Sequence, residues 1–338
     1  CAADLASDPA NCGACGHSCL GGACQNRQCQ PFVVATGLSG PAHLATDGAG
    51  TLFVATIDGA VRSCPTKGCG ASATKVTDIA LDGGNPLISG LAVTGGNVYF
   101  VGYYTSSLYL CPTGGCAKPT VIASGIPNPF HLAVDSTNVY FVSASAPYVG
   151  RCPLPSCASG AVRMGSDGLK AYYGTVADGP HVYWYGGGPT QQFDHAIVYR
   201  IPKTAVDGGP EVLLQDRTVK FGGPTDTNIA LQGGDLYFAE DGPDSGTPAG
   251  TISRMSPPSG APSVVVGNLP PTRGIAVDAA DVYFVSYSSG TVSRCARTGC
   301  TTPTVLASGQ DTPTGPLLTA DAVYWTEYFG GTIKGVAK

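Results

Sequence analysis

The same short pattern recurs seven times along this chain of 338 residues. Each copy begins with an apolar run, passes through a polar turn and ends in a second apolar run, as in GLAVTGGNVYFVGY (90–103) and GIAVDAADVYFVSY (274–287). Successive copies begin 41 to 54 residues apart, a period typical of β-propeller blades. The repeat therefore predicts an all-β fold built from seven blades. The copies begin at His43, Gly90, His131, Gly174, Asn228, Gly274 and Pro316.

Each copy except the last contains two further strand-like segments after the shared pattern. In the sixth copy they are GTVSRC (290–295) and TVLASG (304–309). The chain has 48 glycines and 27 prolines, which separate short apolar runs throughout, as expected of strands joined by turns. We therefore expect four strands in each blade, called strands A to D in chain order.

The seventh copy ends at GTIKGVAK (331–338) and contains no strand D. A matching strand D, PFVVATG (31–37), instead precedes the first copy. Pairing of this segment with the last strand C would complete the seventh blade and remove an exposed sheet edge. We predict a seven-bladed β-propeller over residues 30–338 that is closed by its N-terminal strand.

The fourteen cysteines fall into two even groups, as a disulfide framework requires. Eight form four C-x4-C pairs, each in the turn between strands C and D. The alternatives are a metal site, which lacks histidines at zinc-finger spacing, and a redox pair, which would favour C-x-x-C beside a βαβ pattern. We predict that all fourteen are oxidised, which indicates an oxidising compartment. The pairs are Cys64/Cys69, Cys111/Cys116, Cys152/Cys157 and Cys295/Cys300, and the other six are Cys1, Cys12, Cys15, Cys19, Cys24 and Cys29.

Residues 1–29 contain those six cysteines and are expected to form a separate disulfide-rich module. Their connectivity stays open because spacing does not determine it. Covalent haem attachment requires C-x-x-C-H, and Gly16 interrupts this pattern between Cys15 and His17. Strand direction places the module beside the C-terminus, on the face opposite the loops that join strands B and C.

The inner-strand pattern P-x-H/G-I/L-A-V-D followed by V-Y-F-V resembles that of secreted bacterial β-propellers, including the NHL and streptogramin-lyase-like group. The resemblance covers residues 31–338 and implies the fold but little about function, because such scaffolds host many activities. DLASDPANCGACGHSCLGGACQNRQC (4–29) resembles the Stig1-like cysteine-rich motif found beside propellers in exported bacterial proteins. Together they imply a secreted or cell-surface protein, bacterial in origin, whose signal has been removed. Lipidation of Cys1 is an alternative that would leave an odd number of cysteines.

Charge and hydropathy exclude two classes of partner. Only 12% of the residues are charged and the net charge is −5, with no basic block that would follow a nucleic-acid backbone. No apolar run reaches the roughly 18 residues that a membrane-spanning helix needs. We therefore expect neither nucleic-acid binding nor a transmembrane segment.

Two histidines, His43 and His131, open strand A in the first and third copies. They are the candidate catalytic residues, able to serve as acid and base or to bind a metal together with a carboxylate. The favoured interpretation is structural, with each imidazole hydrogen-bonded to the backbone of the neighbouring blade. No motif of the G-x-S-x-G, H-E-x-x-H or Walker type occurs.

The loops between strands B and C carry most of the candidate binding residues. In propellers these loops share one face, here called the mouth face, with the connections between strands D and A. Exposed aromatic rings among small polar residues can stack on sugars or contact a protein. The alternative is that the rings only cover strand ends. The candidates are Tyr103, Tyr104, Tyr148, Tyr185, Phe193, Tyr287 and Tyr328.

An acidic loop offers a weaker alternative site. Glu240, Asp241 and Asp244 can supply oxygen ligands to calcium, but their spacing does not match an EF-hand loop. We favour a solvated loop and expect no cofactor. The recurring aspartates between strands A and B, such as Asp135 and Asp278, occupy turn positions and are expected to be structural.

Two functions remain open at this point. The first is a non-catalytic extracellular protein for binding, adhesion or assembly, with a glycan or protein partner at the mouth face. Such a protein could form a surface filament by head-to-tail contact through the cysteine module. The second is a lyase or hydrolase that acts on a small molecule or polysaccharide at the channel mouth. Low charge, many disulfides and the appended module favour the first.

Overall fold

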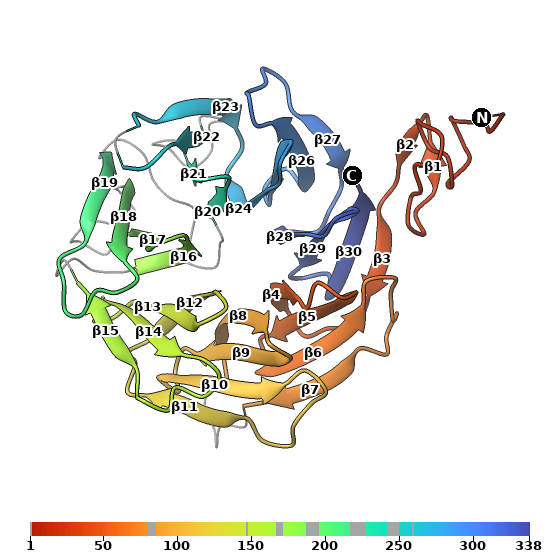
Figure 1. Ribbon diagram of the computed structural model, residues 1–338. Coiled ribbons are helices and arrows are strands. Elements are labelled where there is room, and N and C mark those ends of the chain that lie inside the picture. Colours follow the sequence, from red (N-terminus) through yellow and green to blue (C-terminus); the bar gives the residue numbers. More distant parts are fainter. Residues whose placement is uncertain are drawn as a thin grey trace.

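The computed structural model describes residues 2–79, 86–146, 148–166, 172–186, 196–216, 228–241, 250–258 and 260–338. Seven four-stranded antiparallel sheets are arranged around a central axis, and a two-stranded ribbon stands beside them (Figure 1). The described residues are all-β and contain no helix. In particular, they include no helix with the length and apolar character of a membrane span. The fold predicted from the seven copies is confirmed.

Each blade places its four strands in chain order from the centre outward, except that the seventh takes its outer strand from the N-terminus. Blade 1 consists of β4 (Pro41–Thr46), β5 (Thr51–Thr56), β6 (Ala60–Pro65) and β7 (Thr74–Asp78), and blade 2 of β8 (Ile88–Thr94), β9 (Asn97–Gly102), β10 (Ser107–Pro112) and β11 (Thr120–Ser124). Blade 3 consists of β12 (Pro129–Val134), β13 (Asn138–Ser143), β14 (Val149–Pro153) and β15 (Val162–Gly165), and blade 4 of β16 (Tyr172–Asp178), β17 (His181–Gly186), β18 (Ala196–Pro202) and β19 (Glu211–Asp216). Blade 5 consists of β20 (Ile229–Gln232), β21 (Asp235–Glu240), β22 (Gly250–Met255) and β23 (Ser263–Leu269), and blade 6 of β24 (Thr272–Val277), β25 (Asp281–Ser286), β26 (Thr291–Ala296) and β27 (Thr304–Ala307). Blade 7 consists of β28 (Pro313–Leu318), β29 (Ala322–Glu327), β30 (Thr332–Ala337) and β3 (Phe32–Ala35). The ribbon is β1 (Cys24–Gln25) with β2 (Gln28–Cys29).

The N-terminal strand closes the ring as predicted. In β3, Phe32 pairs with Gly335 and Val33 with Lys334 of β30. The Val34 carbonyl faces the other way and accepts a hydrogen bond of 2.8 Å from the Cys69 amide of blade 1. One short strand therefore completes blade 7 and also joins it to blade 1.

The core lies between the blades. The second strand of a blade is apolar on both faces, and in β9 the run from Val98 to Val101 is buried throughout. This follows from the architecture, because each sheet packs against a neighbouring blade on both sides. The VYFV-like runs in the sequence are continuous rather than alternating for this reason.

The four C-x4-C pairs form disulfides inside their own blades, as predicted. In three of them the second cysteine also donates its backbone amide to strand D of the preceding blade: Cys69 to Val34 (2.8 Å), Cys116 to Val76 (2.9 Å) and Cys300 to Val265 (3.1 Å). The disulfide therefore fixes the hairpin that seals one blade boundary. Such a pattern of disulfides is typical of an oxidising compartment.

The hairpin of blade 3 differs from the other three in the backbone at Cys157. The disulfide with Cys152 forms, but the Cys157 amide donates to the Pro153 carbonyl of its own hairpin at 2.8 Å rather than to blade 2. Cys157 is buried, whereas the second cysteine of each other pair is only half-buried. Its backbone is left-handed, with a φ of 56°.

The physical reason lies one residue earlier, at Ser156. In the other three hairpins a glycine stands at this position and adopts the positive φ that the turn requires. Serine does not take that conformation readily, so the left-handed residue of this turn is Cys157 itself. The shift turns its amide back into the hairpin. The three glycines are Gly68, Gly115 and Gly299.

The cysteine module packs beside the C-terminus, where strand direction placed it (Figure 1). Its disulfides are Cys12–Cys24 and Cys19–Cys29; Cys15 is also disulfide-bonded, and Cys1 lies outside the described residues. The Nε2 atom of His17 lies 2.7 Å from the carbonyl oxygen of Lys338. The Gln28 side chain donates a 2.8 Å hydrogen bond to the carbonyl of Val305 in β27. The module is therefore docked on blades 6 and 7 by specific polar contacts.

Candidate binding face and central channel

The inner strands surround an apolar cavity of about 350 Å³. Its walls consist mostly of aliphatic side chains, and its titratable side chains are those of His43 and His131. The two imidazoles are in contact, with ring centroids 5.5 Å apart and planes at 87°. Gly90 of the intervening blade makes this possible, since a Cβ at this position would lie only 3.0 Å from the Cα of His131.

The histidine pair is held in the neutral form. Burial lowers the pKa of His43 to about 4, although part of this ring remains open to the channel. Burial, together with the neighbouring His43, lowers the pKa of His131 to about 3. No carboxylate contributes to either shift. The expected hydrogen bond to a neighbouring blade is not formed by Nε2 of His131, which is buried without a partner. The rings instead pack against each other.

Three aromatic rings and an arginine gather on the mouth face at blades 6, 7 and 1. They line a cavity of about 450 Å³, here called the aromatic pocket, whose lining residues are Ala42, Arg273, Tyr287, Thr312, Thr314, Tyr328 and Phe329. The Arg273 guanidinium lies 4.3 Å from the centroid of the Tyr287 ring. The rings of Tyr328 and Phe329 meet edge to face at 5.1 Å. Phe329 is 75% exposed, which is unusual for so large an apolar side chain.

Glu327 anchors the turn that carries Tyr328 and Phe329. Its buried carboxylate accepts hydrogen bonds from the Thr332 hydroxyl (2.5 Å) and the Lys334 ammonium (2.9 Å). Burial alone would raise the pKa of Glu327, but these hydrogen bonds lower it below the usual value. The carboxylate therefore stays charged and fixes the turn that carries the rings of Tyr328 and Phe329.

A second aromatic cluster lies on the mouth face at blades 2 and 3. The ring of Tyr103 meets that of Tyr104 at 4.9 Å and that of Phe130 at 6.0 Å. Tyr104 is 56% exposed. Tyr148 is less open, because its ring packs on Phe141 and lies under the guanidinium of Arg163 at 5.4 Å.

Two candidates from the sequence do not contribute to the exposed surface that the structure describes. The prediction that Tyr185 is exposed is wrong. The residue lies within β17 rather than in the loop after it, and its side chain is 0% exposed. Gly174 makes room for the ring, since a Cβ there would lie 2.2 Å from the Cε1 atom of Tyr185. Phe193 lies outside the described residues.

The acidic loop residues are engaged locally. Glu240 is buried and accepts hydrogen bonds from Thr251 (3.2 Å) and Ser253 (3.3 Å). Asp241 accepts one from the Thr272 amide (3.1 Å), and burial raises the pKa of Asp241. Asp244 lies outside the described residues. The one cluster of three metal-ligating side chains in the described part of the chain consists of disulfide-bonded cysteines of the module.

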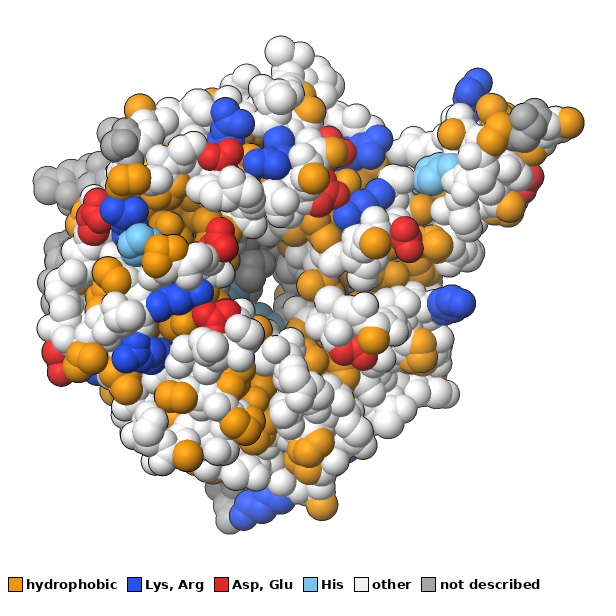
Figure 2. Space-filling model, viewed as in Figure 1, with side chains coloured by type: hydrophobic (Ala, Val, Ile, Leu, Met, Phe, Trp, Pro, Cys, Tyr) orange, Lys and Arg blue, Asp and Glu red, His pale blue; other side chains and the backbone are white. Residues whose placement is uncertain are grey.

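The aspartates of the A-to-B turns are structural, as expected, and they also act across blade boundaries. Asp135 and Asp278 each accept two backbone hydrogen bonds within their own turn. Asp135 also pairs with Lys203 of the next blade at 2.7 Å, and Asp278 pairs with Lys338 at 2.8 Å. Figure 2 shows acidic and basic side chains next to one another around the central opening. These inter-blade pairs were not predicted from the sequence.

Comparisons with known proteins identify the fold. No family model and no curated protein matches the chain. Among solved structures, a streptogramin B lyase is 14% identical with a TM-score of 0.67, covering 91% of this chain and 96% of its own. YCF48 bound to the D1 peptide is 10% identical with a TM-score of 0.67, covering 91% and 96%. The nidogen/laminin complex contains a chain that is 16% identical with a TM-score of 0.53, covering 73% and 89%. Propellers of similar architecture thus include a lyase and proteins in binding complexes.

Proposed function

We propose that this chain is a non-catalytic extracellular binding protein whose aromatic pocket binds a saccharide. The observation that carries the proposal is the group of rings formed by the exposed Phe329 and the half-buried Tyr287 and Tyr328 on the mouth face. Aromatic rings supply a large and rigid contact area at a low cost in conformational entropy. A cavity of about 450 Å³ is also within the usual size range of small-molecule sites.

The chemistry of the pocket suits a sugar. The C–H faces of a pyranose can stack on Tyr328 or Phe329, while its hydroxyls accept from Arg273 or exchange hydrogen bonds with Thr312 at the rim. Stacking of Arg273 on Tyr287 orients the guanidinium and limits the entropy lost when a ligand binds. A protein partner is the competing ligand class.

The channel supports a role without catalysis. An acid–base mechanism needs a group that exchanges a proton near neutral pH, whereas burial keeps His43 and His131 neutral. The cavity walls around them are aliphatic. The disulfides support secretion or display at a cell surface, because such frameworks persist in oxidising compartments.

The test is an array of defined saccharides and proteins, probed with the full chain and two variants. Phe329→Ala removes the most exposed ring, and Val206→Ala is the matched control because Val206 is exposed on the hairpin of blade 4, away from the pocket. We expect saccharide binding that Val206→Ala preserves and that Phe329→Ala weakens about tenfold, or about 1.4 kcal/mol. Binding to proteins alone, or saccharide binding that is indifferent to Phe329, would contradict the proposal.

A further inference from the structure

On the face opposite the mouth, three blade boundaries are bridged by the same pair of charges. The strand C residue that pairs with the first valine of strand B is Ile201 in blade 4, Cys295 in blade 6 and Val336 in blade 7. Two positions after each lies a cation that pairs with an aspartate of the preceding blade. The pairs are Lys203 with Asp135 (2.7 Å), Arg297 with Asp235 (3.5 Å) and Lys338 with Asp278 (2.8 Å).

The boundary between blades 7 and 1 has no cation at this position, and neither do the three boundaries where Thr113, Leu154 and Pro257 stand there. Cys64 has the equivalent register, so the equivalent of the cation is Thr66. The Tyr324 side chain of blade 7 reaches across the boundary instead, and its hydroxyl donates to the Thr66 carbonyl at 3.5 Å. A cavity of about 690 Å³ opens here between the blades and the cysteine module. We call it the junction pocket.

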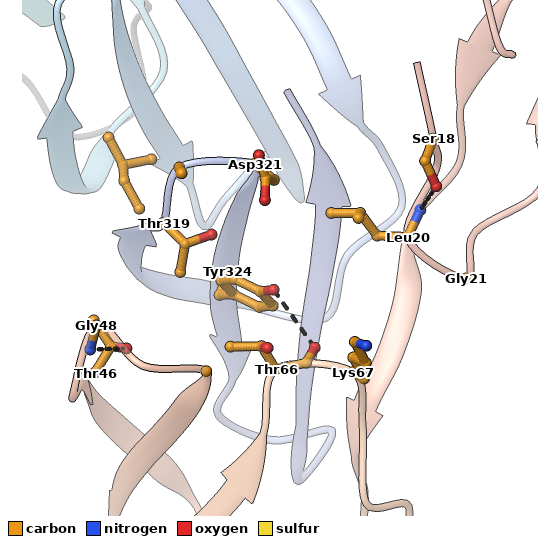
Figure 3. A pocket seen from close by; sticks show the side chains of 13 residues that line it. Ser18, Leu20, Gly21, Thr46, Gly48, Thr66, Lys67, Thr319, Asp321 and Tyr324 are labelled. Carbon is orange, nitrogen blue, oxygen red and sulfur yellow. Dashed lines mark hydrogen bonds between the residues drawn. The ribbon is translucent and has the colours of Figure 1, made fainter. Parts of the chain in front are cut away.

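Two opposite charges line the junction pocket without meeting. Lys67 follows Thr66 in the hairpin of blade 1, and Asp321 lies in the A-to-B turn of blade 7. Both side chains are exposed, and neither forms an ion pair or hydrogen bond within the described residues. Figure 3 shows Tyr324 between them. Burial raises the pKa of the Tyr324 hydroxyl, and the negative charge of Asp321 acts in the same direction, so the carboxylate is close enough to be felt there.

The remaining walls combine small polar groups with aliphatic ones. Ser18 of the module contributes its hydroxyl, which accepts from the Leu20 amide and keeps its own proton available. Leu20 and Leu318 provide apolar surface on two sides. Gly21 and Gly48 have nothing within 4 Å of an added Cβ, which leaves the rim open. The module therefore forms one wall of a site whose other walls belong to the propeller.

We propose that the junction pocket binds a small zwitterion, an amino acid or dipeptide with an apolar side chain. Its ammonium group would lie at Asp321 and its carboxylate at Lys67, the two opposite charges that line the pocket. The apolar side chain would contact Leu20 and Leu318. At the three bridged boundaries the protein neutralises an aspartate with its own cation, whereas in the junction pocket a ligand would supply both complementary charges. The site is separate from the aromatic pocket and does not depend on the function proposed for it.

Calorimetric titration of the full chain tests this, using L-leucine and leucyl-leucine as probes. N-acetyl-leucine lacks the ammonium group and leucinamide lacks the carboxylate, so each removes one of the two interactions. We expect a dissociation constant on the order of 1 mM or lower for at least one zwitterion and binding about tenfold weaker for both blocked forms. Asp321→Asn should remove the preference for a free ammonium group only, and Lys67→Gln the preference for a free carboxylate only.

Matched controls carry the same chemical changes elsewhere on the surface. Lys118→Gln lies in the hairpin of blade 2 and Asp207→Asn in that of blade 4, and both should bind the zwitterions like the wild type. Saccharide binding at the aromatic pocket should be unchanged in all four variants. The proposal is overturned if neither zwitterion binds below about 10 mM. It is equally overturned if Asp321→Asn and Lys67→Gln bind all probes as the wild type does.

Discussion

Shortening Val34 to alanine should destabilise the whole propeller, because this residue is at the point where the ring closes. Its side chain is fully buried in the cluster formed by β3, blade 7 and blade 1, which includes Leu52 and Ile333. The substitution removes two methyl groups, or about 1.6 kcal/mol at 0.8 kcal/mol per buried group. A residual cavity adds to this, so we expect a loss of about 2 to 3 kcal/mol.

The neighbouring Val33 provides the matched control within the same strand. It is 51% exposed, whereas Val34 is 0% exposed, because successive side chains of a strand point to opposite faces. Val33→Ala should therefore change stability by no more than about 0.5 kcal/mol. Both variants retain the backbone pairing of β3 with β30, so the difference between them isolates the buried side chain.

Chemical denaturation with the disulfides intact, followed by tryptophan fluorescence and circular dichroism, measures both variants. Trp325 is buried in blade 7 and reports on the region next to the closure. We expect one cooperative transition that moves to lower denaturant in Val34→Ala and stays in place in Val33→Ala. If the two variants unfold alike, or if blade 7 unfolds separately with the rest unaffected, the N-terminal strand does not hold the ring together.

Three further predictions concern the staples and the channel. Replacing Cys111 and Cys116 by serine should cost about 2 kcal/mol, measured by thermal unfolding, and an unchanged midpoint would mean that the hairpin needs no staple. Lowering the pH below 6.5 should destabilise the fold by up to about 1.4 kcal/mol per pH unit for each of the two histidines, down to about pH 4 for His43 and about pH 3 for His131, because their unfolded forms bind protons that the folded forms do not. His131→Asn should flatten this dependence in denaturant titrations at several pH values, and an equally steep profile would show that other groups cause it. Gly90→Ala should cost about 1 to 3 kcal/mol because its Cβ meets backbone atoms of His131 at 3.0 Å, and wild-type stability would contradict that contact.

Periodicity was sufficient to predict the fold, since it reports directly on packing. The continuous VYFV-like runs require burial on both faces, and the displaced strand PFVVATG has its place only at the end of the last blade. The hairpin disulfides follow from the position of each pair within the repeat, although the altered backbone at Cys157 does not. The pairing of Cys12 with Cys24 could not be predicted either, because six cysteines in a short module permit many connectivities.

The candidate site was harder to predict because it depends on which loops become neighbours. Tyr287 and Tyr328 were candidates individually, but their meeting with Arg273 and Phe329 requires the ring geometry. Tyr185 looked like a loop residue because it precedes a glycine run, yet the strand extends through it. An alignment of the copies would have revealed the inter-blade cations. Lys203 and its equivalents recur two positions after the strand C residue that pairs with the first valine of strand B.

Another prediction concerns the module and self-association. If the module mediates head-to-tail contacts, light scattering should find larger species as the concentration of the full chain rises. A chain that stays monomeric at every concentration would restrict the module to its role beside blades 6 and 7.

The measurement that tests the central claim most directly combines binding and turnover at the aromatic pocket. The saccharide that binds best on the array is titrated into the full chain and into Phe329→Ala, and after prolonged incubation with the wild type it is recovered and weighed by mass spectrometry. We expect saturable binding that weakens about tenfold in the variant, and a saccharide recovered with its mass unchanged. A shortened or unsaturated product, or equal binding by both proteins, would contradict it.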